Sequence, residues 1–284
     1  RYPTKNNGYK VDMTCQETYR GTTLFTTRYE YVNLYHTLTD WWNAFNVLPD
    51  DYFKKPHRVV FLDGHAQGGL DNVWKTLFGE FHYIQHLPKA VGLCFEHAVF
   101  IPAGYKSPLF TDPQRERCPR KDMASAFSEF VLKQHGLQSV EPIRGQVVIV
   151  DRQPYVSHPR SDPNSIQRQS YNLDKLKEKL AQLPGVNVQL VRLETMSFRE
   201  QVKLIRQTHV LIGNHGAALS HLMFMDSSRS HVIEFSYDFN NFFQYMSEWK
   251  GISFEMVSIG AWGIGALDED KIEKTAELIR RYTV

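Results

Sequence analysis

Residues 208–221 read THVLIGNHGAALSH, a short apolar run followed at once by a cluster of small residues. The run 210–212 is apolar and largely β-branched, which predicts a strand buried on both faces, as in a parallel sheet. We expect Gly213 to end this strand and residues 216–218 to open a helix. Backbone N–H groups at such a helix start, together with the helix dipole, favour a phosphate. The stretch therefore predicts an α/β fold with a turn that binds a nucleotide diphosphate.

The glycine spacing of this turn matches neither of two common phosphate-binding motifs. It lacks the third glycine of the dinucleotide fingerprint and the Lys-Ser/Thr pair of the P-loop. The alternative interpretation is a tight strand-to-helix connection whose small residues serve packing. His215 favours a ligand site, because packing alone would favour an apolar residue at the centre of the turn. His221 is interpreted as a helix-surface or core-edge histidine.

The length and charge of the chain limit its class. Its 284 residues can bury a large core and suit two α/β domains better than one. Lys and Arg total 33 against 31 Asp and Glu, and the resulting net charge of +2 disfavours nucleic acid as a partner. Aromatic residues make up 13% of the chain and offer flat faces to sugar rings as well as to the core.

The sequence shows neither a membrane span nor a signal peptide. No part of it approaches the run of about eighteen apolar residues that a bilayer requires. The first residue is Arg1 rather than Met, so we expect an N-terminal segment, with any membrane anchor, to lie outside this sequence. Three cysteines are too few and too spread for a zinc site or a disulfide scaffold. We predict one disulfide, between Cys94 and Cys118, consistent with a secretory compartment.

Strands and helices alternate in the N-terminal half. Apolar residues from Asn33 to Val47 recur at helical spacing and predict an amphipathic helix. Turn residues at 136–145 indicate a linker, so we divide the chain into domains 1–138 and 139–284. The other elements predicted here are strands at 22–27, 58–62 and 98–101 and helices at 70–78 and 123–134.

The same alternation continues in the C-terminal half and implies a parallel sheet, whose ligand site lies outside the carboxyl ends of the strands. Arg152, Glu234 and the turn after Ile212 all fall at such ends. The acidic residues 268–270 could be mistaken for metal-binding carboxylates. They begin a C-terminal helix, however, and we interpret them as a structural cap. The predicted elements here are strands at 146–152, 186–191 and 231–235 and helices at 173–182 and 197–207.

Several longer motifs carry a family resemblance. They are TRYEYVNLYHTLTDW at 27–41, VFLDGH at 60–65, VDR at 150–152, Arg168 with Asn172, LETMSF at 193–198, GNHGAAL at 213–219 and VIEF at 232–235. Through these motifs the chain resembles glycosyltransferase family 61, and within it the plant-type core β-1,2-xylosyltransferases of N-glycan maturation. The matches extend over most of residues 20–240.

This resemblance implies an inverting transferase with two Rossmann-like domains facing a cleft, the GT-B type. The acceptor would lie mostly in domain 1–138 and the sugar nucleotide mostly in domain 139–284. The implied reaction is xylosyl transfer from UDP-xylose to the core β-mannose of an N-glycan or glycoprotein. The implied setting is the Golgi lumen, as a type II membrane protein that meets the membrane only through an anchor outside this sequence. The alternatives are another UDP-sugar, such as UDP-arabinose or UDP-N-acetylglucosamine, or a non-catalytic nucleotide-sugar or glycan-binding protein.

An inverting transfer needs a base for the acceptor hydroxyl and groups that hold the departing diphosphate. His36 and Asp40 are four residues apart on the predicted helix and share one face, where a carboxylate can fix the imidazole tautomer. We predict His36 as the base and Asp40 as its orienting residue. The alternatives are Asp40 as the base with His36 as a substrate contact, or an exposed ion pair without function.

The remaining candidate residues bind either the donor or the acceptor. Guanidinium groups suit phosphate, and a carboxylate such as Glu234 suits ribose hydroxyls. Because arginines and a helix start neutralise the diphosphate, we predict no catalytic metal and no other cofactor. Asn33 is also a candidate helix N-cap. The predicted donor-binding residues are Arg152, Arg168, Asn214, His215, Gly216, Ala217, Ala218 and Glu234, and the predicted acceptor or cleft residues are Arg28, Asn33, Asp63 and His65.

Overall fold

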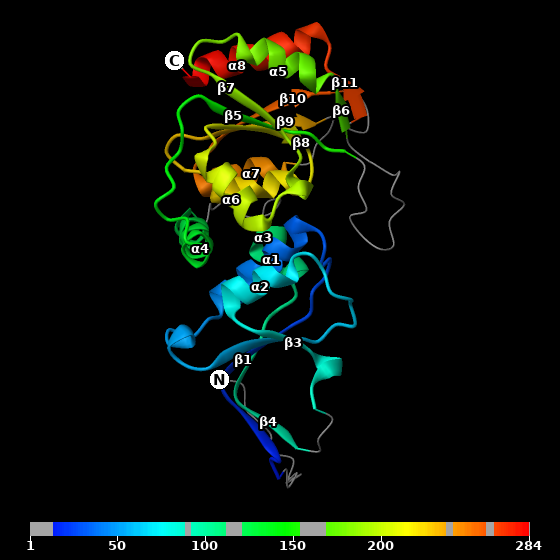
Figure 1. Cartoon of the computed structure of the whole chain (residues 1–284), viewed down its shortest axis with the longest axis vertical. Helices are drawn as coiled ribbons and strands as arrows, with labels where there is room; N and C mark the ends of the chain where they lie inside the picture. Colours follow the sequence, from blue (N-terminus) through cyan, green and yellow to red (C-terminus); the bar gives the residue numbers. More distant parts are fainter. Residues whose placement is uncertain are drawn as a thin grey trace.

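The structure is a computed structural model that describes residues 14–88, 92–111, 121–153, 169–236, 241–259 and 264–283. Two parallel sheets lie toward opposite ends of the long axis, and helices pack between them (Figure 1). The predicted mixed α/β fold with parallel sheets is confirmed.

The N-terminal sheet has four parallel strands in the order β3-β2-β1-β4. Leu24, Val59 and Phe61 on one face of this sheet belong to the same buried apolar cluster as residues of helices α1 and α2. These elements are β1 (Glu17–Thr26), α1 (Leu34–Asn46), β2 (His57–Phe61), α2 (Asp71–Phe78), β3 (Phe81–Tyr83) and β4 (Leu93–Phe100).

The C-terminal sheet has five parallel strands in the order β10-β9-β8-β5-β7. Alternate residues of its central strands enter two different cores: Val148 packs toward α6 and α7, while Val147 and Ile149 pack toward α5 and α8. Both faces are therefore covered, as the apolar strand run predicts. The elements are β5 (Gln146–Val150), α5 (Leu173–Ala181), β7 (Asn187–Val191), α6 (Phe198–Gln207), β8 (Val210–Asn214), β9 (His231–Ser236), α7 (Phe242–Lys250), β10 (Ser253–Ser258) and α8 (Glu269–Thr283).

Shorter elements complete the described part of the chain. A separate pair of parallel strands joins residues 169–171 to residues 264–266. Single turns of 3₁₀ helix occur at several strand ends, and a longer one follows β8. These elements are β6 (Gln169–Tyr171), β11 (Ile264–Ala266), α3 (Pro108–Thr111), α4 (Lys121–Gln134), and the 3₁₀ helices η1 (Tyr52–Lys54), η2 (Ile84–His86), η3 (Gly104–Lys106), η5 (Leu193–Thr195) and η6 (Ala217–Phe224).

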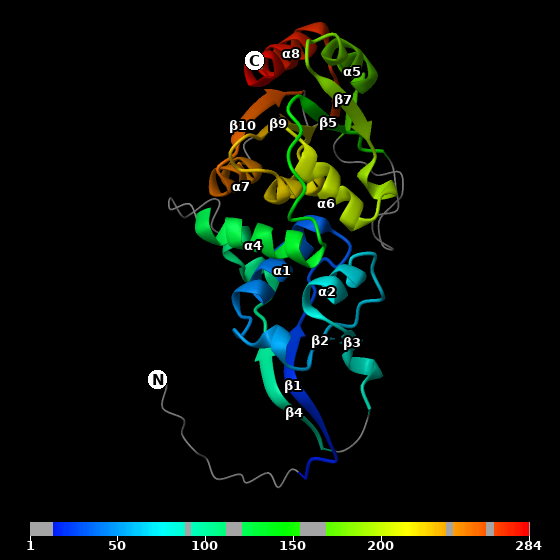
Figure 2. The ribbon, with the colours of Figure 1, turned by 60° about the vertical axis from the view of Figure 1, so that its left-hand side comes forward.

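One apolar core joins the two halves of the molecule. Trp41 and Trp42 of α1 are fully buried. The Trp41 ring contacts Phe198 of α6 at 5.3 Å between centroids, and Trp42 contacts both Phe127 of α4 and Trp249 of α7. Helix α4 lies between the two sheets (Figure 2) and contacts α2 on one side and α7 and η6 on the other. The two sheets are therefore held by a common set of packed aromatic side chains.

Each sheet has a switch point, the place between two neighbouring strands from which the chain connections run in opposite directions along the sheet. In the N-terminal sheet it lies between β1 and β4, because β2 and β3 continue on the other side of β1. In the C-terminal sheet it lies between β5 and β8, because β7 lies on the other side of β5. Ligands of open parallel sheets bind outside the carboxyl ends of the strands at such points. Both points are therefore places to look for a site.

Three local expectations need correction. Gly213 does not end its strand, because β8 continues through Gly213 to Asn214 and Gly213 packs against Leu219 and Val150. The helix that follows is a 3₁₀ helix. Cys94 forms its disulfide with Cys15, because β1 and β4 are neighbours and their register pairs Thr18 with Cys94. Cys118 lies outside the described residues.

No helix within the described ranges is both long and apolar enough to cross a membrane.

Candidate functional site

A pocket of about 270 Å³ opens between the two halves of the molecule. One wall comes from the start of α1 and from α3. The other comes from the turn after β8 and from the start of α7. Its lining is rich in aromatic side chains and carries two histidines, His36 and His215, on different walls. The lining residues are Asn33, Tyr35, His36, Phe110, His215, Gly216, Ala217, Phe242 and Phe243.

The C-terminal wall presents His215 in a fixed orientation. Its ring nitrogen Nδ1 makes a hydrogen bond to the carboxylate of Glu234. The two meet because β8 and β9 are neighbours and Gly213 pairs with Glu234 in their register. Only 1% of the Glu234 side chain and 12% of the His215 side chain are exposed. The bond at Nδ1 holds the imidazole in one orientation at the pocket wall. The carboxylate of Glu234, which we predict to accept from ribose hydroxyls, is buried in this structure against His215.

Arg152 lies beside the same turn. It follows β5 by two residues, at the switch point of the C-terminal sheet. Its guanidinium is so near Gly216 that a Cβ on Gly216 would come within 2.6 Å of Nη1. Asn214, the last residue of β8, is buried, and Ala217 and Ala218 begin the 3₁₀ helix η6. The structure thus brings together the predicted donor-binding residues that it describes. Arg168 lies outside the described residues.

The N-terminal wall carries His36 in the first turn of α1. The Asn33 side chain caps this helix, as predicted, by accepting hydrogen bonds from the backbone N–H groups of Tyr35 at 3.0 Å and His36 at 3.4 Å. The His36 ring lies 5.6 Å from the Phe110 ring, centroid to centroid. Its Nδ1 is buried and has no hydrogen-bond partner among the described residues. Burial lowers the pKa of His36, and the charge of Glu30 opposes this shift. His36 therefore lines the pocket with an imidazole whose lowered pKa favours the neutral form.

Asp40 occupies a different place from the one its spacing predicts. Its side chain is fully buried, does not line the pocket, and accepts a hydrogen bond at Oδ1 from the backbone N–H of Gly104, at 2.7 Å. Burial raises the pKa of Asp40 to about 7, and this hydrogen bond opposes the rise. Asp40 and His36 share no hydrogen bond or ion pair among the described contacts. The predicted pairing is therefore not formed, because the carboxylate turns inward to the segment that follows β4.

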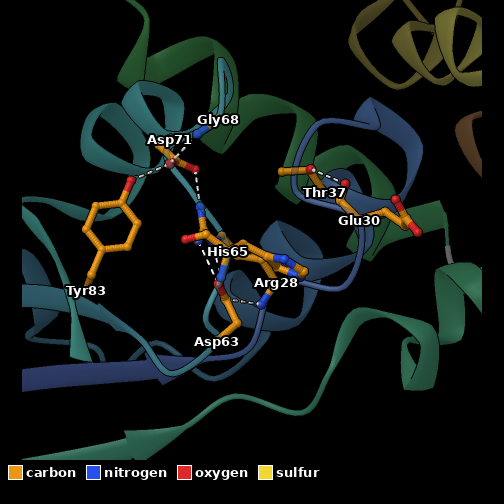
Figure 3. A network of polar contacts seen from close by, with 8 residues as sticks. All are labelled: Arg28, Glu30, Thr37, Asp63, His65, Gly68, Asp71 and Tyr83. Carbon is orange, nitrogen blue, oxygen red and sulfur yellow. Dashed lines mark hydrogen bonds and ion pairs between the residues drawn. The ribbon is translucent and has the colours of Figure 1, made fainter. Parts of the chain in front are cut away.

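Arg28, Asp63 and His65 form a separate buried network in the N-terminal half (Figure 3). The Arg28 guanidinium donates to Asp63 at 2.6 Å and to Asp71 at 2.7 Å, and it lies 4.2 Å from the centre of the Phe61 ring. The backbone oxygen of His65 also accepts from Arg28, at 3.3 Å. None of these residues lines the pocket. Their predicted acceptor or cleft role is therefore unsupported: the side chains of Arg28 and Asp63 bond to each other, and the ring of His65 stacks on Tyr31.

Two other sequence interpretations are confirmed. His221 is buried, and its ring nitrogens bond to the backbone oxygen of Ala218 and to Gln201, as expected for a core-edge histidine. Asp268 caps α8 by accepting from the backbone N–H of Lys271 at 3.0 Å. Among the described residues, no group of three or more His, Cys, Asp or Glu side chains is placed to share a metal ion.

Sequence reasoning missed the aromatic part of the pocket. Phe110, Phe242 and Phe243 line it, and the Phe243 ring lies 5.0 Å from that of His215. Tyr35 lines it from the N-terminal wall, and its ring packs 5.9 Å from that of Phe242. These phenylalanines lie outside the recognisable motifs, so no local signal marks them. They come together only when α1, α3 and α7 are folded against each other.

The chain belongs to the Glycosyltransferase 61 family, whose model matches residues 34–233. That stretch contains both histidines of the pocket.

Among its relatives are plant enzymes. The chain is 29% identical to a beta-1,2-xylosyltransferase of Arabidopsis thaliana over 95% of this chain and 57% of the relative. It is also 29% identical to a beta-1,2-xylosyltransferase of Oryza sativa subsp. japonica over 95% of this chain and 55% of the relative. An EGF domain-specific O-linked N-acetylglucosamine transferase of Drosophila melanogaster is 32% identical over 47% of this chain and 24% of the relative. The chain thus spans a little more than half the length of the xylosyltransferases that it matches.

Proposed function

We propose that the chain is an inverting glycosyltransferase of the GT-B type that transfers xylose from UDP-xylose to the core β-mannose of an N-glycan in β-1,2 linkage. The observation that carries this proposal is the pocket between the two halves, which places His36 opposite His215 and Gly216. The donor diphosphate lies at the C-terminal wall and the acceptor approaches from the N-terminal wall. Domains 1–138 and 139–284 correspond to these two sides. Family membership and the plant relatives support the choice of reaction.

The reaction is a single displacement at the anomeric carbon. The acceptor oxygen forms a bond to that carbon while the bond from the carbon to the diphosphate oxygen breaks, so the configuration inverts. His36 takes the acceptor hydroxyl proton, because its ring lines the pocket and burial lowers its pKa, which keeps the imidazole neutral. The departing UDP carries the new negative charge. Arg152, His215 and the backbone N–H groups at the start of η6 stabilise that charge.

Glu234 acts in this scheme through His215. A carboxylate that accepts from Nδ1 holds the imidazole in one tautomer and one orientation, which is the usual role of an acidic partner of a histidine. The buried Glu234 does this at the edge of the pocket. Asp40 likewise acts at a distance, since it anchors the segment after β4 rather than touching the substrate.

The test of the base is the variant His36→Ala. We expect it to retain UDP binding, measured by calorimetry, and to lose turnover by about 100-fold or more, the scale that a general base contributes. The matched control is His82→Ala, an exposed histidine of β3, which should keep full turnover. A variant His36→Ala with nearly normal turnover would remove His36 from the reaction. His65 would be an unsuitable replacement, because its ring stacks on Tyr31 and does not line the pocket.

The donor sugar is tested by binding. A ligand of the folded state raises the melting temperature by mass action, so a panel of UDP-sugars ranks the donors directly. We expect UDP-xylose to give the largest shift. A larger shift with UDP-arabinose or UDP-N-acetylglucosamine would keep the transferase and change the sugar. Shifts without transfer to any glycan acceptor would indicate a binding protein.

We also propose that transfer needs no divalent metal, since Arg152 and the turn after β8 supply the positive charge. Activity should survive excess chelator. Loss of activity that manganese restores would contradict the proposal.

The disulfide Cys15–Cys94 supports an oxidising compartment of the secretory pathway. The Golgi lumen is the compartment that we propose, on the resemblance to N-glycan xylosyltransferases.

A further inference from the structure

Two exposed tyrosines stand next to His36. Tyr29 is 47% exposed and Tyr105 is 41% exposed. Their ring centroids are 5.2 Å apart, and the Tyr29 ring meets the His36 ring edge-on at 5.4 Å. Large aromatic side chains that are this exposed and adjacent to each other are uncommon on a protein surface without a ligand. Neither tyrosine has a role in the mechanism given above.

The two tyrosines come from the switch point of the N-terminal sheet. Tyr29 follows the end of β1, and Tyr105 follows the end of β4. Arg152 and His215 follow β5 and β8 at the corresponding point of the C-terminal sheet. Ligands of open parallel sheets bind outside the carboxyl ends of the strands at the switch point, and this rule applies to the tyrosine pair as it does to Arg152 and His215.

The backbone on which these tyrosines stand is fixed. The η3 segment that carries Tyr105 is tied to α1, because the buried Asp40 accepts from the backbone N–H of Gly104. Tyr29 follows Arg28, whose backbone N–H donates to Asp63 at 2.8 Å and whose side chain is buried in ion pairs. The backbone positions of both residues are thus fixed while their side chains stay partly exposed, so little ordering of the backbone is required when a ligand binds. The Lys106 ammonium lies 5.5 Å from the centre of the Tyr105 ring.

We propose that Tyr29 and Tyr105 form the acceptor subsite, a platform on which a pyranose ring of the acceptor glycan stacks. One face of a pyranose presents mainly C–H groups, which are apolar and pack on an aromatic face. A sugar on Tyr29 lies beside His36, the group that takes the acceptor proton. This inference rests on the proposed function for the direction of the reaction. It replaces the acceptor role predicted for Arg28, Asp63 and His65, because Arg28 and Asp63 bond to each other and the His65 ring stacks on Tyr31.

The experiment compares alanine and phenylalanine variants of both tyrosines. We expect Tyr29→Ala and Tyr105→Ala each to raise the acceptor KM by about tenfold, the loss of one ring-sized apolar contact. The donor KM should not change. Tyr29→Phe and Tyr105→Phe keep the ring and should resemble the unaltered protein. Tyr171→Ala is the matched control, because this tyrosine is 49% exposed and lies on β6 of the C-terminal half.

A second measurement separates this inference from the proposed function. Binding of a soluble N-glycan that contains the core β-mannose is measured by NMR without any donor, so it does not depend on transfer. Loss of glycan binding in the alanine variants supports the platform even if no donor is ever turned over. Normal acceptor KM and normal glycan binding in both alanine variants, in a protein that transfers sugar, would overturn the platform and leave the transferase intact. Absence of both transfer and glycan binding in the unaltered protein would overturn both.

Discussion

Arg28 and Arg152 occupy the same place in their two sheets and have different surroundings. Each follows the strand beside the switch point, β1 or β5, by two residues. Arg28 is 1% exposed and is held by two carboxylates, Asp63 and Asp71. Arg152 lies against Gly216 at a turn that lines the pocket. A position at a strand end therefore does not by itself make an arginine a ligand-binding residue.

The difference comes from the neighbouring strand ends. Asp63 follows β2, and Asp71 begins α2, so the N-terminal sheet supplies its own anions to Arg28. At the corresponding edge of the C-terminal sheet the buried carboxylate, Glu234, bonds to His215. The first half thus uses its arginine to fix the loops of the fold. The second half places its arginine beside Gly216 at the wall of the pocket.

The largest expected effect follows from removing Arg28. Arg28→Ala leaves Asp63 and Asp71 buried without their partner, and breaking a buried pair in this way costs about 3–5 kcal/mol. The free energy of unfolding, measured by denaturant titration, should fall by this amount. Arg152→Ala is the matched comparison and should lower it by less, because Asp63 and Asp71 keep their buried partner in this variant. Equal losses in the two variants would remove the contrast between the two arginines.

The converse experiment measures donor affinity. Arg152→Ala removes a charge-assisted contact to a partly desolvated phosphate and should weaken UDP binding by about 2–4 kcal/mol. Calorimetry on the folded variant gives the value directly. An unchanged affinity would show that the diphosphate lies elsewhere.

Two glycines extend the comparison to the second strand at each switch point. Gly104→Ala would place its Cβ 2.3 Å from Asp40 Oδ1 and 2.4 Å from Thr39 Oγ1, both on buried side chains, and should lower stability by about 1–3 kcal/mol. Gly216→Ala meets the far end of the flexible Arg152 side chain, which can move. We therefore expect Gly216→Ala to melt near the temperature of the unaltered protein and to bind UDP less tightly. A destabilised Gly216→Ala with normal affinity would reverse this assignment.

The smallest expected effect concerns pH. Burial lowers the pKa of His36 and Glu30 raises it, so the neutral base should persist to pH values below the ordinary pKa of histidine. Turnover should rise with pH as His36 loses its proton and then stay level. Removing the carboxylate charge with Glu30→Gln lowers the pKa further, so the acid limb of the kcat profile should move to lower pH by a fraction of a unit. Glu80→Gln, an exposed carboxylate paired with Lys75, is the control. A shift toward higher pH in Glu30→Gln would show that another group controls the acid limb.

The sequence predicted the features that depend on neighbouring residues. The buried strand before Gly213, the capping of α1 by Asn33 and the cap of α8 at Asp268 all follow from local patterns. The placing of His215 and Arg152 at one turn follows from the rule that ligands bind at the carboxyl ends of parallel strands.

The features that depend on the order of the strands were missed. The bond between His215 and Glu234 requires β8 and β9 to be adjacent in one particular register. The disulfide Cys15–Cys94 joins residues 79 positions apart because β1 lies beside β4. Helical spacing correctly placed His36 and Asp40 on one helix. It carried no information on the segment after β4, whose Gly104 N–H draws Asp40 inward.

The packing of Trp41 and Trp42 against partners from both halves has a mechanical consequence. A hinge motion that swung the sheets apart would expose these rings to water, at a cost of about 25 cal/mol for each Å² of apolar surface. A wide opening that separates the two sheets is therefore unfavourable. We expect the chain to melt in a single cooperative transition. We expect substrates to enter by rearrangement of the segments around the pocket opening rather than by separation of the two halves.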